Sequence, residues 1–349
     1  MYRSSAERYL LAADIGGTKT NIVLAVAGAE RSQIVAQRFY ASQDHPGLDA
    51  ILDTFLNLSE VGPRARHIVG ACLAVAGPVE AADATLTNLG WRISSTALSR
   101  RFGIGKVELV NDFAAAGLGI DLLASNELAP LQSGRAVEHG ARVVMGAGTG
   151  LGVCLLTWGQ GRYAAHSSEA GHADFAPANE VQDGLLAHLR RQFGRVSYER
   201  VLSGPGLAHI LEFLRDSGAG RPSDALLAAA GERGDLAAAI TEFALSARDP
   251  LAVRALDLFT AIYGAFAGNM ALTMLTRGGV YISGGIGPKI AAKLKDGTFM
   301  RAFADKGRFR ELLSTIPVRL VMNPQVGLYG ALEVARRMSL GCGDVPAVE

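Results

Sequence analysis

The stretch that decides the fold reads Leu10-Leu11-Ala12-Ala13-Asp14-Ile15-Gly16-Gly17-Thr18-Lys19-Thr20-Asn21. An apolar strand ends in two glycines and a threonine, and a second apolar strand, Ile22-Val23-Leu24-Ala25, follows at once. This order predicts a β-hairpin with a tight turn that carries little side chain. Such a turn exposes backbone N–H groups, and clustered N–H groups bind phosphate oxygens. Asp14 adds a carboxylate at the end of a buried strand, where it needs a metal ion or a hydrogen-bond partner.

A second string of the same kind reads Val144-Met145-Gly146-Ala147-Gly148-Thr149-Gly150-Leu151-Gly152 and runs into the apolar Val153-Cys154-Leu155-Leu156. Two such hairpins can hold the phosphate tail of one nucleotide between two lobes. The Rossmann fingerprint is a poor fit because it needs G-x-G-x-x-G at the start of a helix, and neither string contains a Walker A loop. For either string by itself, an ordinary glycine hairpin is the alternative.

The remaining periodicity places these hairpins in two similar α/β halves. The first half contains expected strands and one helix, and the second repeats its pattern of strand, glycine turn and strand, so the halves are interpreted as diverged copies of one motif. Residues 214–250 are expected to form helices and loops. The expected strands are 9–14, 21–26, 33–39, 68–75, 107–110, 142–145 and 279–283, with helices near 47–58 and 327–339.

Composition narrows the class of protein. A chain of 349 residues is more often two domains than one. A formal net charge of +1, without a basic block, argues against nucleic acid and anionic membranes as partners. Cys72, Cys154 and Cys342 are scattered without metal-binding spacing, which favours a reducing compartment. Residues 1–8 lack the apolar core of a secretory signal, so a cytoplasmic protein is expected.

One apolar segment, from Leu258 to Leu275, approaches the length of a membrane span and contains the G-x-x-x-G pattern Gly264–Gly268. Asn269 and Thr273 interrupt it, and a strand-like stretch follows. The sequence therefore predicts a buried helix of an α/β core, in which glycines allow close packing.

Three groups of polar residues are candidates for chemistry. Asn111-Asp112 stands where a strand stops and a helix begins, so Asp112 is either the N-cap of that helix or a general base for a phosphate acceptor. Glu169 and His172 flank Gly171 and could bind vicinal hydroxyls, although a histidine beside glycine is often structural. Adding Asp174 gives no recognised zinc pattern. Glu199, before a Gly-Pro-Gly turn, reads by itself as a surface acid.

Taken in order, these motifs resemble those of the bacterial glucokinases of proteobacterial type, in the sugar kinase branch of the hexokinase–actin–Hsp70 superfamily. The similarity extends from about residue 10 to 340, and the ordered set is far more specific than any one piece. The motifs that carry it are Asp14–Thr18, Thr87-Asn88-Leu89-Gly90-Trp91, Asn111-Asp112-Phe113, Gly146–Gly152, Glu169–Pro177, Glu199–Leu207 and Ser283-Gly284-Gly285-Ile286.

The resemblance implies a two-domain α/β fold of the hexokinase/actin (ribonuclease H-like) type with a cleft between the domains. The smaller domain would comprise residues 1–112 and about 326–349, and the larger one residues 113–325. It also implies ATP-dependent transfer of phosphate to the 6-hydroxyl of glucose, with glucose binding first and driving closure of the lobes.

The resemblance assigns a role to each candidate residue. Asp112 would be the catalytic base, and Mg²⁺ would accompany ATP with Asp14 orienting its water shell. The sugar would be bound by Asn88, Asn111, Glu169, His172 and Glu199. The nucleotide would be bound by Ala13, Asp14, Ile15, Gly16, Gly17, Thr18, Gly146, Gly148, Thr149, Gly150, Gly284 and Gly285.

Two features bear on how far the resemblance extends. Ser167-Ser168 stands where relatives often carry Pro-Gly, which could alter the edge of the sugar pocket. The cysteine cluster of the zinc-containing ROK (repressor, open reading frame, kinase) group is absent.

Three other readings remain open at this point: a kinase for another hexose or amino sugar, a sugar-sensing regulator, and an actin- or Hsp70-like ATPase. A regulator would need a helix-turn-helix for which residues 1–8 give no room. An ATPase would leave the hydroxyl-binding set unexplained. ADP or polyphosphate as donor is equally open, and a homodimer is compatible with the sequence.

Overall fold

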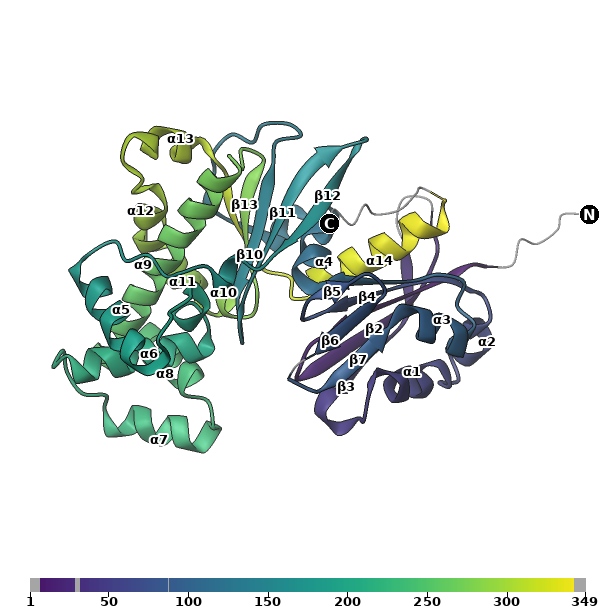
Figure 1. Ribbon diagram of the computed structural model, residues 1–349, viewed down its shortest axis with the longest axis horizontal. Coiled ribbons are helices and arrows are strands. Elements are labelled where there is room, and N and C mark those ends of the chain that lie inside the picture. The colour runs from purple at the N-terminus through teal and green to yellow at the C-terminus, as the bar shows by residue number, and fades with distance from the viewer. Residues whose placement is uncertain (1–6, 29–31, 87, 342–349) are drawn as a thin grey trace, which may run out of the picture. The chain divides into compact units, whose positions relative to one another are not determined.

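A computed structural model describes residues 7–28, 32–86 and 88–341 (Figure 1). Thr87, Cys342, residues 1–6 and the end of the chain, on which expectations were stated above, lie outside the described residues. The chain divides into two compact units. Unit 1 comprises residues 1–123, 159–167 and 325–349, and unit 2 comprises residues 124–158 and 168–324.

The main sheet of unit 1 has five strands in the order β3-β2-β1-β4-β8. β1 and β2 form the predicted antiparallel hairpin, which pairs Tyr9 with Val26 and closes at Ile15 opposite Thr20. β4 and β8 continue the sheet as parallel strands. The strands are β1 (Tyr9–Ile15), β2 (Lys19–Val26), β3 (Gln33–Ala41), β4 (Ile68–Val75) and β8 (Val107–Asn111).

The alternation of side chains along β1 sorts the residues onto two faces of this sheet. Leu11, Ala13 and Ile15 belong to one hydrophobic cluster, whereas Leu10 and Ala12 belong to another on the opposite face. Since successive side chains of a strand point to opposite faces, Asp14 points to the same face as Ala12. That face is covered by α4 (Asp112–Gly119) and α14 (Val326–Ser339).

α14 lies beside α4 in unit 1, as Figure 1 shows. The two helices approach so closely that a Cβ at Gly330 would lie 1.7 Å from the carbonyl oxygen of Ala115, so only glycine fits there. The expected late helix is therefore present, and it packs on α4 and β1 of unit 1. The other elements of unit 1 include α1 (Leu48–Leu56), α2 (Gly62–Ala65), α3 (Ser95–Phe102), and a small sheet of β5 (Val79–Glu80), β6 (Asp83–Leu86) and β7 (Trp91–Ser94).

The second sheet repeats the topology of the first. Its order is β12-β11-β10-β13-β14-β9, with β10 and β11 antiparallel and β13 and β14 added in parallel. Both sheets thus contain the predicted motif of a glycine hairpin followed by parallel strands, and β9 adds an antiparallel strand at the edge of the second sheet. The strands are β9 (Leu128–Gln132), β10 (Arg142–Ala147), β11 (Leu151–Gly159), β12 (Arg162–Ser168), β13 (Gly279–Ser283) and β14 (Val318–Val321).

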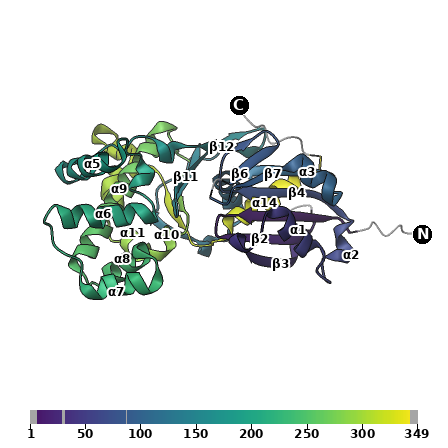
Figure 2. The same ribbon diagram turned by 60° about the horizontal axis from the view of Figure 1, so that its bottom comes forward.

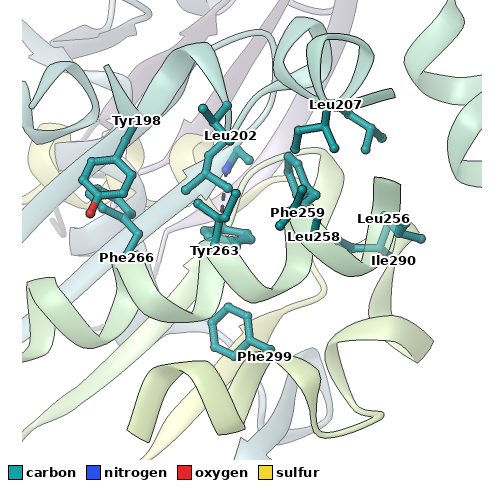
Figure 3. Packing of buried hydrophobic residues seen from close by; sticks show 14 of the residues in the cluster. Tyr198, Leu202, Leu207, Leu256, Leu258, Phe259, Tyr263, Phe266, Ile290 and Phe299 are labelled. Carbon is teal, nitrogen blue, oxygen red and sulfur yellow. Dashed lines mark hydrogen bonds between the residues drawn. The ribbon is translucent and has the colours of Figure 1, made fainter. Parts of the chain in front are cut away.

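The core of unit 2 is built around α9 (Pro250–Thr273), the segment for which a buried helix is predicted. Within the described residues it is the one helix long and apolar enough to cross a bilayer, and most of its apolar window is buried inside the protein. Tyr263, Phe259 and Phe266 of α9 are fully buried and meet Leu202 and Phe299 in one cluster (Figure 3). The prediction of a buried helix for this segment is therefore confirmed.

The other helices of unit 2 cover this core. α6, α8 and α7 follow one another in space in both views (Figures 1 and 2). Residues 214–250, where only helices and loops are expected, form α7 and α8. The helices are α5 (Glu180–Phe193), α6 (Gly204–Asp216), α7 (Asp224–Arg233), α8 (Leu236–Leu245), α10 (Ile286–Lys289), α11 (Ala291–Leu294), α12 (Thr298–Ala304) and α13 (Arg310–Thr315).

Candidate functional site

The first glycine turn is held by its carbonyl groups and leaves N–H groups unused. The Gly16 N–H donates to the Lys19 carbonyl at 3.0 Å, and Ser42 donates its hydroxyl to the Gly16 carbonyl at 2.8 Å and its N–H to the Thr18 carbonyl at 3.0 Å. Within the described part of the chain, the N–H groups of Gly17 and Thr18 make no hydrogen bond. Two adjacent backbone donors are thus available to an anion at this turn.

Asn88 lies beside this turn. A Cβ at Gly17 would lie 3.6 Å from the Cβ of Asn88, which is exposed in the turn between β6 and β7. The structure therefore brings together two motifs that are far apart in the sequence. Trp91, from the same motif as Asn88, is buried in the core of unit 1.

The Asp14 carboxyl faces the start of α14. A Cβ at Gly327 would lie 3.5 Å from Asp14 Oδ2, so the absence of a side chain at Gly327 leaves space beside the carboxyl. Burial raises the pKa of Asp14 from 3.8 to about 6. Among the described residues, no hydrogen bond or ion pair meets this carboxyl. A carboxylate that is only partly exposed and has no protein partner fits an external cation with its water shell.

We expect Asp14→Asn to stabilise the folded protein at pH 8 by at most about 3 kcal/mol. Because the pKa in the folded state lies above the unfolded value, stability contributed by the protonated carboxyl is full below pH 3.8 and lost as the pH rises through about 6. The gain from Asn should therefore be larger at pH 8 than at pH 5, as measured by urea unfolding. Asp44→Asn, an exposed carboxylate of unit 1, is the control, and an equal gain at both pH values for Asp14→Asn would contradict the interpretation.

The junction between β8 and α4 separates the roles of Asn111 and Asp112. Asn111 is the N-cap, because its Oδ1 accepts from the N–H groups of Phe113 at 2.9 Å and Ala114 at 3.2 Å. Its Nδ2 donates to the Gly77 carbonyl at 3.3 Å. Asp112 is the first helical residue, and its Oδ1 accepts from the Phe113 N–H at 2.9 Å. The alternative that Asp112 is the N-cap is therefore wrong: α4 begins without needing its carboxylate for the cap.

Two hydrogen bonds, one to α9 and one to α6, hold the second glycine turn, which lies in unit 2. The Ala147 N–H donates to the buried Tyr263 hydroxyl at 3.2 Å, and the Gly148 carbonyl accepts from the Gly204 N–H at 2.8 Å. Thr149 and Gly150 have N–H groups that make no hydrogen bond within the described residues. The turn thus presents donors in the same way as the first one.

Four glycines of the nucleotide set differ in what they do. Gly146 and Gly284 are needed for packing, because a Cβ at Gly146 would lie 2.6 Å from the Ser283 carbonyl and Gly284 has a φ of +80° with the Ala147 carbonyl 2.7 Å from its Cβ position. Gly285 and Gly148 face open space: nothing lies within 4 Å of a Cβ at Gly285, and the nearest atom to one at Gly148 is 4.0 Å away. Packing does not demand glycine at these two positions, which leaves room for a ligand.

That open space is a cavity of about 940 Å³ within unit 2. It joins the second glycine turn to the N-terminal ends of α6, α8 and α10. Three predicted nucleotide residues, Gly148, Thr149 and Gly285, line it. Sequence reasoning missed the contribution of α8, from Asp235 to Thr241; its one signal is Asp235 before an apolar run, which is the N-cap of α8 and accepts from the Ala238 N–H at 2.9 Å.

We expect Gly285→Val to fill part of this cavity without disturbing the fold, since its backbone has a φ of −77° that any residue adopts. If a nucleotide occupies the cavity, the added side chain should raise the KM for ATP roughly tenfold, because overpacking costs about 1–3 kcal/mol. Steady-state kinetics at saturating sugar measures this change. Gly231→Val, also in open space but on α7 away from the cavity, should leave the KM unchanged; an equal effect of both variants would contradict the assignment.

Glu169, His172 and Glu199 form a cluster in unit 2. His172 Nε2 lies 3.8 Å from Glu169 Oε2 and 4.0 Å from Glu199 Oε1. Two backbone hydrogen bonds join the segments that carry them: Phe175 donates to the Val196 carbonyl and Tyr198 donates to the Ala173 carbonyl, both at 2.9 Å. The side chains of Glu169 and His172 are more than half exposed, so they can accept hydrogen bonds from the hydroxyls of a ligand, and His172 can also donate to them.

Glu199 is not a simple surface acid. Its Oε2 accepts from the Leu151 N–H of the second glycine turn at 2.9 Å, and its side chain is one-third exposed. The expected Gly-Pro-Gly turn after Glu199 is wrong, because these three residues begin helix α6. Ser203 is the N-cap of α6, and Pro205 lies in the first helical turn, where its missing N–H costs nothing.

The predicted residues thus fall into one group in each unit. Unit 1 carries the first glycine turn, Asn88, Asn111 and Asp112, and unit 2 carries the second glycine turn, Gly284-Gly285 and the Glu169–His172–Glu199 cluster. Across the described residues, no three histidine, cysteine, aspartate or glutamate side chains are arranged to hold a metal ion by themselves.

Comparison with known proteins gives one consistent family. The family model described as Glucokinase matches residues 11–338. A glucokinase of Synechocystis sp. is 43% identical over 340 residues, which cover 92% of this chain and 96% of the relative. One of Photorhabdus laumondii subsp. laumondii is 38% identical, with coverage of 93% and 95%.

Solved structures agree with this. The crystal structure of a glucokinase from an Antarctic psychrotroph matches with a TM-score of 0.80 at 32% identity and covers 94% of this chain and 99% of that one. A ROK family glucokinase from Streptomyces griseus, in complex with glucose and AMPPNP, matches with a TM-score of 0.61 at 20% identity, covering 94% and 99%. At that identity the second match shows the fold alone, and the fold is that of the two-domain, actin-like sugar kinases.

Proposed function

Since the chain belongs to the glucokinase family, we propose that it transfers the terminal phosphate of ATP to the 6-hydroxyl of glucose. The observation that carries this proposal is the family match over residues 11–338, which includes every residue of the candidate site. The site chemistry supports it, because two turns offer backbone donors to phosphates and one cluster offers carboxylates and an imidazole to hydroxyls. A cytoplasmic location follows as a prediction.

We propose that Asp112 is the base that takes the proton from the 6-hydroxyl. Phosphoryl transfer needs alignment of the nucleophile and neutralisation of phosphate charge more than covalent help. Asp112 is suited to aligning the nucleophile. Asn111, not Asp112, caps the helix, and the Phe113 N–H orients the Asp112 carboxylate. The Asn111 amide has two N–H groups and donates one of them to the Gly77 carbonyl, so the other can donate to a sugar oxygen, while Oδ1 accepts from the first turn of α4.

The sugar-binding group of the proposal is Glu169, His172 and Glu199 in unit 2, with Asn88 and Asn111 from unit 1. Carboxylates accept from sugar hydroxyls and the imidazole either donates or accepts, so the cluster can discriminate among hydroxyl orientations. The backbone N–H groups of Gly17, Thr18, Thr149 and Gly150 would donate to phosphate oxygens. The cavity beside Gly285 would hold the nucleoside.

Mg²⁺ fits Asp14, whose half-buried carboxyl has no protein partner among the described residues. When bound with ATP, the ion would neutralise negative charge on the β- and γ-phosphates. Asp14 would hold a water of its shell, and the space beside Gly327 accommodates it.

An ATPase is the second candidate, because the two glycine turns by themselves would suit any nucleotide-binding protein of this superfamily. The Glu169–His172–Glu199 cluster argues against it, since ATP hydrolysis has no use for a hydroxyl-binding group. A coupled kinase assay over a panel of hexoses and phosphate donors tests the proposal. We expect turnover with glucose and ATP to exceed that with mannose, fructose or glucosamine, and with ADP or polyphosphate as donor. A higher kcat/KM for another sugar or donor would replace glucose or ATP in the proposal.

A further inference from the structure

We propose that Glu199 couples the two substrates: besides binding the sugar, it fixes the glycine turn that binds the nucleotide phosphates. This inference rests on the proposed function, and it assigns a positioning role to a residue for which the sequence indicates a sugar contact alone. All the atoms involved belong to unit 2.

The two oxygens of the Glu199 carboxylate face different partners. Oε2 accepts from the Leu151 N–H at 2.9 Å, at the point where the second glycine turn enters β11. Oε1 lies 4.0 Å from His172 Nε2, within the cluster that we assign to the sugar. One rigid carboxylate therefore spans the turn and the sugar group, and moving either oxygen moves the other.

The turn depends on this contact because it approaches the carboxylate very closely. A Cβ at Gly150 would lie 2.5 Å from Glu199 Oε2, so any side chain at this position would force the carboxylate to move. Gly150 therefore leaves the space that the carboxylate fills. A second bond, from the Gly204 N–H to the Gly148 carbonyl at 2.8 Å, ties the other side of the same turn to the segment that begins at Glu199.

The segment that carries Glu199 is itself rigid. The Glu199 carbonyl accepts from the Ser203 hydroxyl at 2.7 Å, and the neighbouring Tyr198 hydroxyl accepts from Asn269 of α9 at 3.0 Å. Tyr198 packs on Phe266, as Figure 3 shows, and the ring centroids are 4.4 Å apart. Since the backbone is held, the freedom left at this position is that of the Glu199 side chain.

A sugar hydroxyl bound to Oε1 would remove that freedom. The carboxylate would then hold the Leu151 N–H in place, and the turn would lose less conformational entropy when phosphate binds. Linkage requires the reverse effect to have the same size, so a bound nucleotide must raise sugar affinity by the same factor. We expect a factor of roughly fivefold to tenfold, at the lower end of the usual range for coupled sites.

Gly150→Ala tests the coupling from the side of the turn. Its Cβ would displace the flexible end of Glu199 rather than backbone, so the fold should persist. We expect glucose affinity, measured by calorimetric titration without nucleotide, to fall about tenfold, although the substituted residue lies on the nucleotide turn. The enhancement of glucose affinity by a non-hydrolysable ATP analogue should disappear.

Gly148→Ala is the matched control, because it lies on the same turn but has no atom closer than 4.0 Å to its Cβ. It should weaken binding of the analogue while glucose affinity stays within about twofold. In a Glu199→Ala background, where the carboxylate is gone, Gly150→Ala should change glucose affinity no further.

Two results would overturn the coupling. One is a glucose affinity of Gly150→Ala equal to that of Gly148→Ala; the other is a further loss on adding Gly150→Ala to Glu199→Ala. Failure of the proposed function is separate and visible in the wild-type protein, which would then bind no glucose and form no sugar phosphate. A wild type that phosphorylates glucose but shows no mutual enhancement of glucose and analogue leaves the function standing and removes the coupling.

Discussion

Asp112→Asn is expected to lower kcat by about two to four orders of magnitude while the KM values for glucose and ATP change by no more than a few fold. Asn keeps the shape of the side chain and an oxygen that can accept from the Phe113 N–H, as Asp112 Oδ1 does at 2.9 Å. It cannot accept a proton from the sugar hydroxyl. The loss should therefore fall on turnover, which rapid-mixing and steady-state measurements of product formation separate from binding.

The position of the N-cap makes this prediction sharp. Asn111 is the N-cap of α4, and Asn and Asp are equally good at that position, so Asp112→Asn should leave the thermal unfolding midpoint within a degree or two. A loss of turnover in this variant therefore cannot come from a weakened helix. Asp44→Asn, an exposed carboxylate of the same unit, should leave both kcat and stability unchanged. A fall of less than tenfold in kcat for Asp112→Asn would mean that the base lies elsewhere.

Glu169→Gln and His172→Ala are each expected to raise the KM for glucose, or lower kcat/KM, by roughly tenfold to a hundredfold, with the KM for ATP nearly unchanged. His172→Ala removes a hydrogen-bond partner of a sugar hydroxyl, and Glu169→Gln replaces one accepting oxygen by an NH2 group that only donates. A hydroxyl left unpaired in a bound complex costs about 1–3 kcal/mol. His172 Nε2 stands 3.8 Å from Glu169 Oε2, so one hydroxyl can bridge both, and the double variant should lose less than the product of the single losses.

The matched control for this pair is Asp174→Asn, in the same loop but paired with Arg195 at 2.7 Å. An exposed ion pair contributes little, so glucose kinetics should stay within about twofold. A larger effect of Glu169→Gln or His172→Ala on ATP than on glucose would contradict their assignment to the sugar.

The parts of the fold that the sequence predicted well are those with a short-range cause. The two hairpins follow from apolar strands interrupted by glycine, and the burial of the segment around Tyr263 follows from its composition. The alternation along β1 also fixes the direction of Asp14, since Ala12 and Asp14 must share a face.

The parts that sequence reasoning missed depend on contacts between distant residues. The choice of Asn111 over Asp112 as N-cap is decided by where β8 ends, and both residue types cap equally well. Glu199 reaches Leu151 through the packing of α9 against both segments, which leaves no local pattern. The wall of the cavity formed by Asp235–Thr241 lies in an alanine-rich stretch without a motif.

The most direct test of the central claim is the release of ADP by the wild-type protein with Mg²⁺ and ATP, measured with and without glucose while the sugar product is identified. We predict that glucose 6-phosphate forms in a one-to-one ratio with ADP and that ADP release without glucose is slower by orders of magnitude. ADP release at a similar rate in the absence of glucose, or a product phosphorylated at another hydroxyl, would contradict the account.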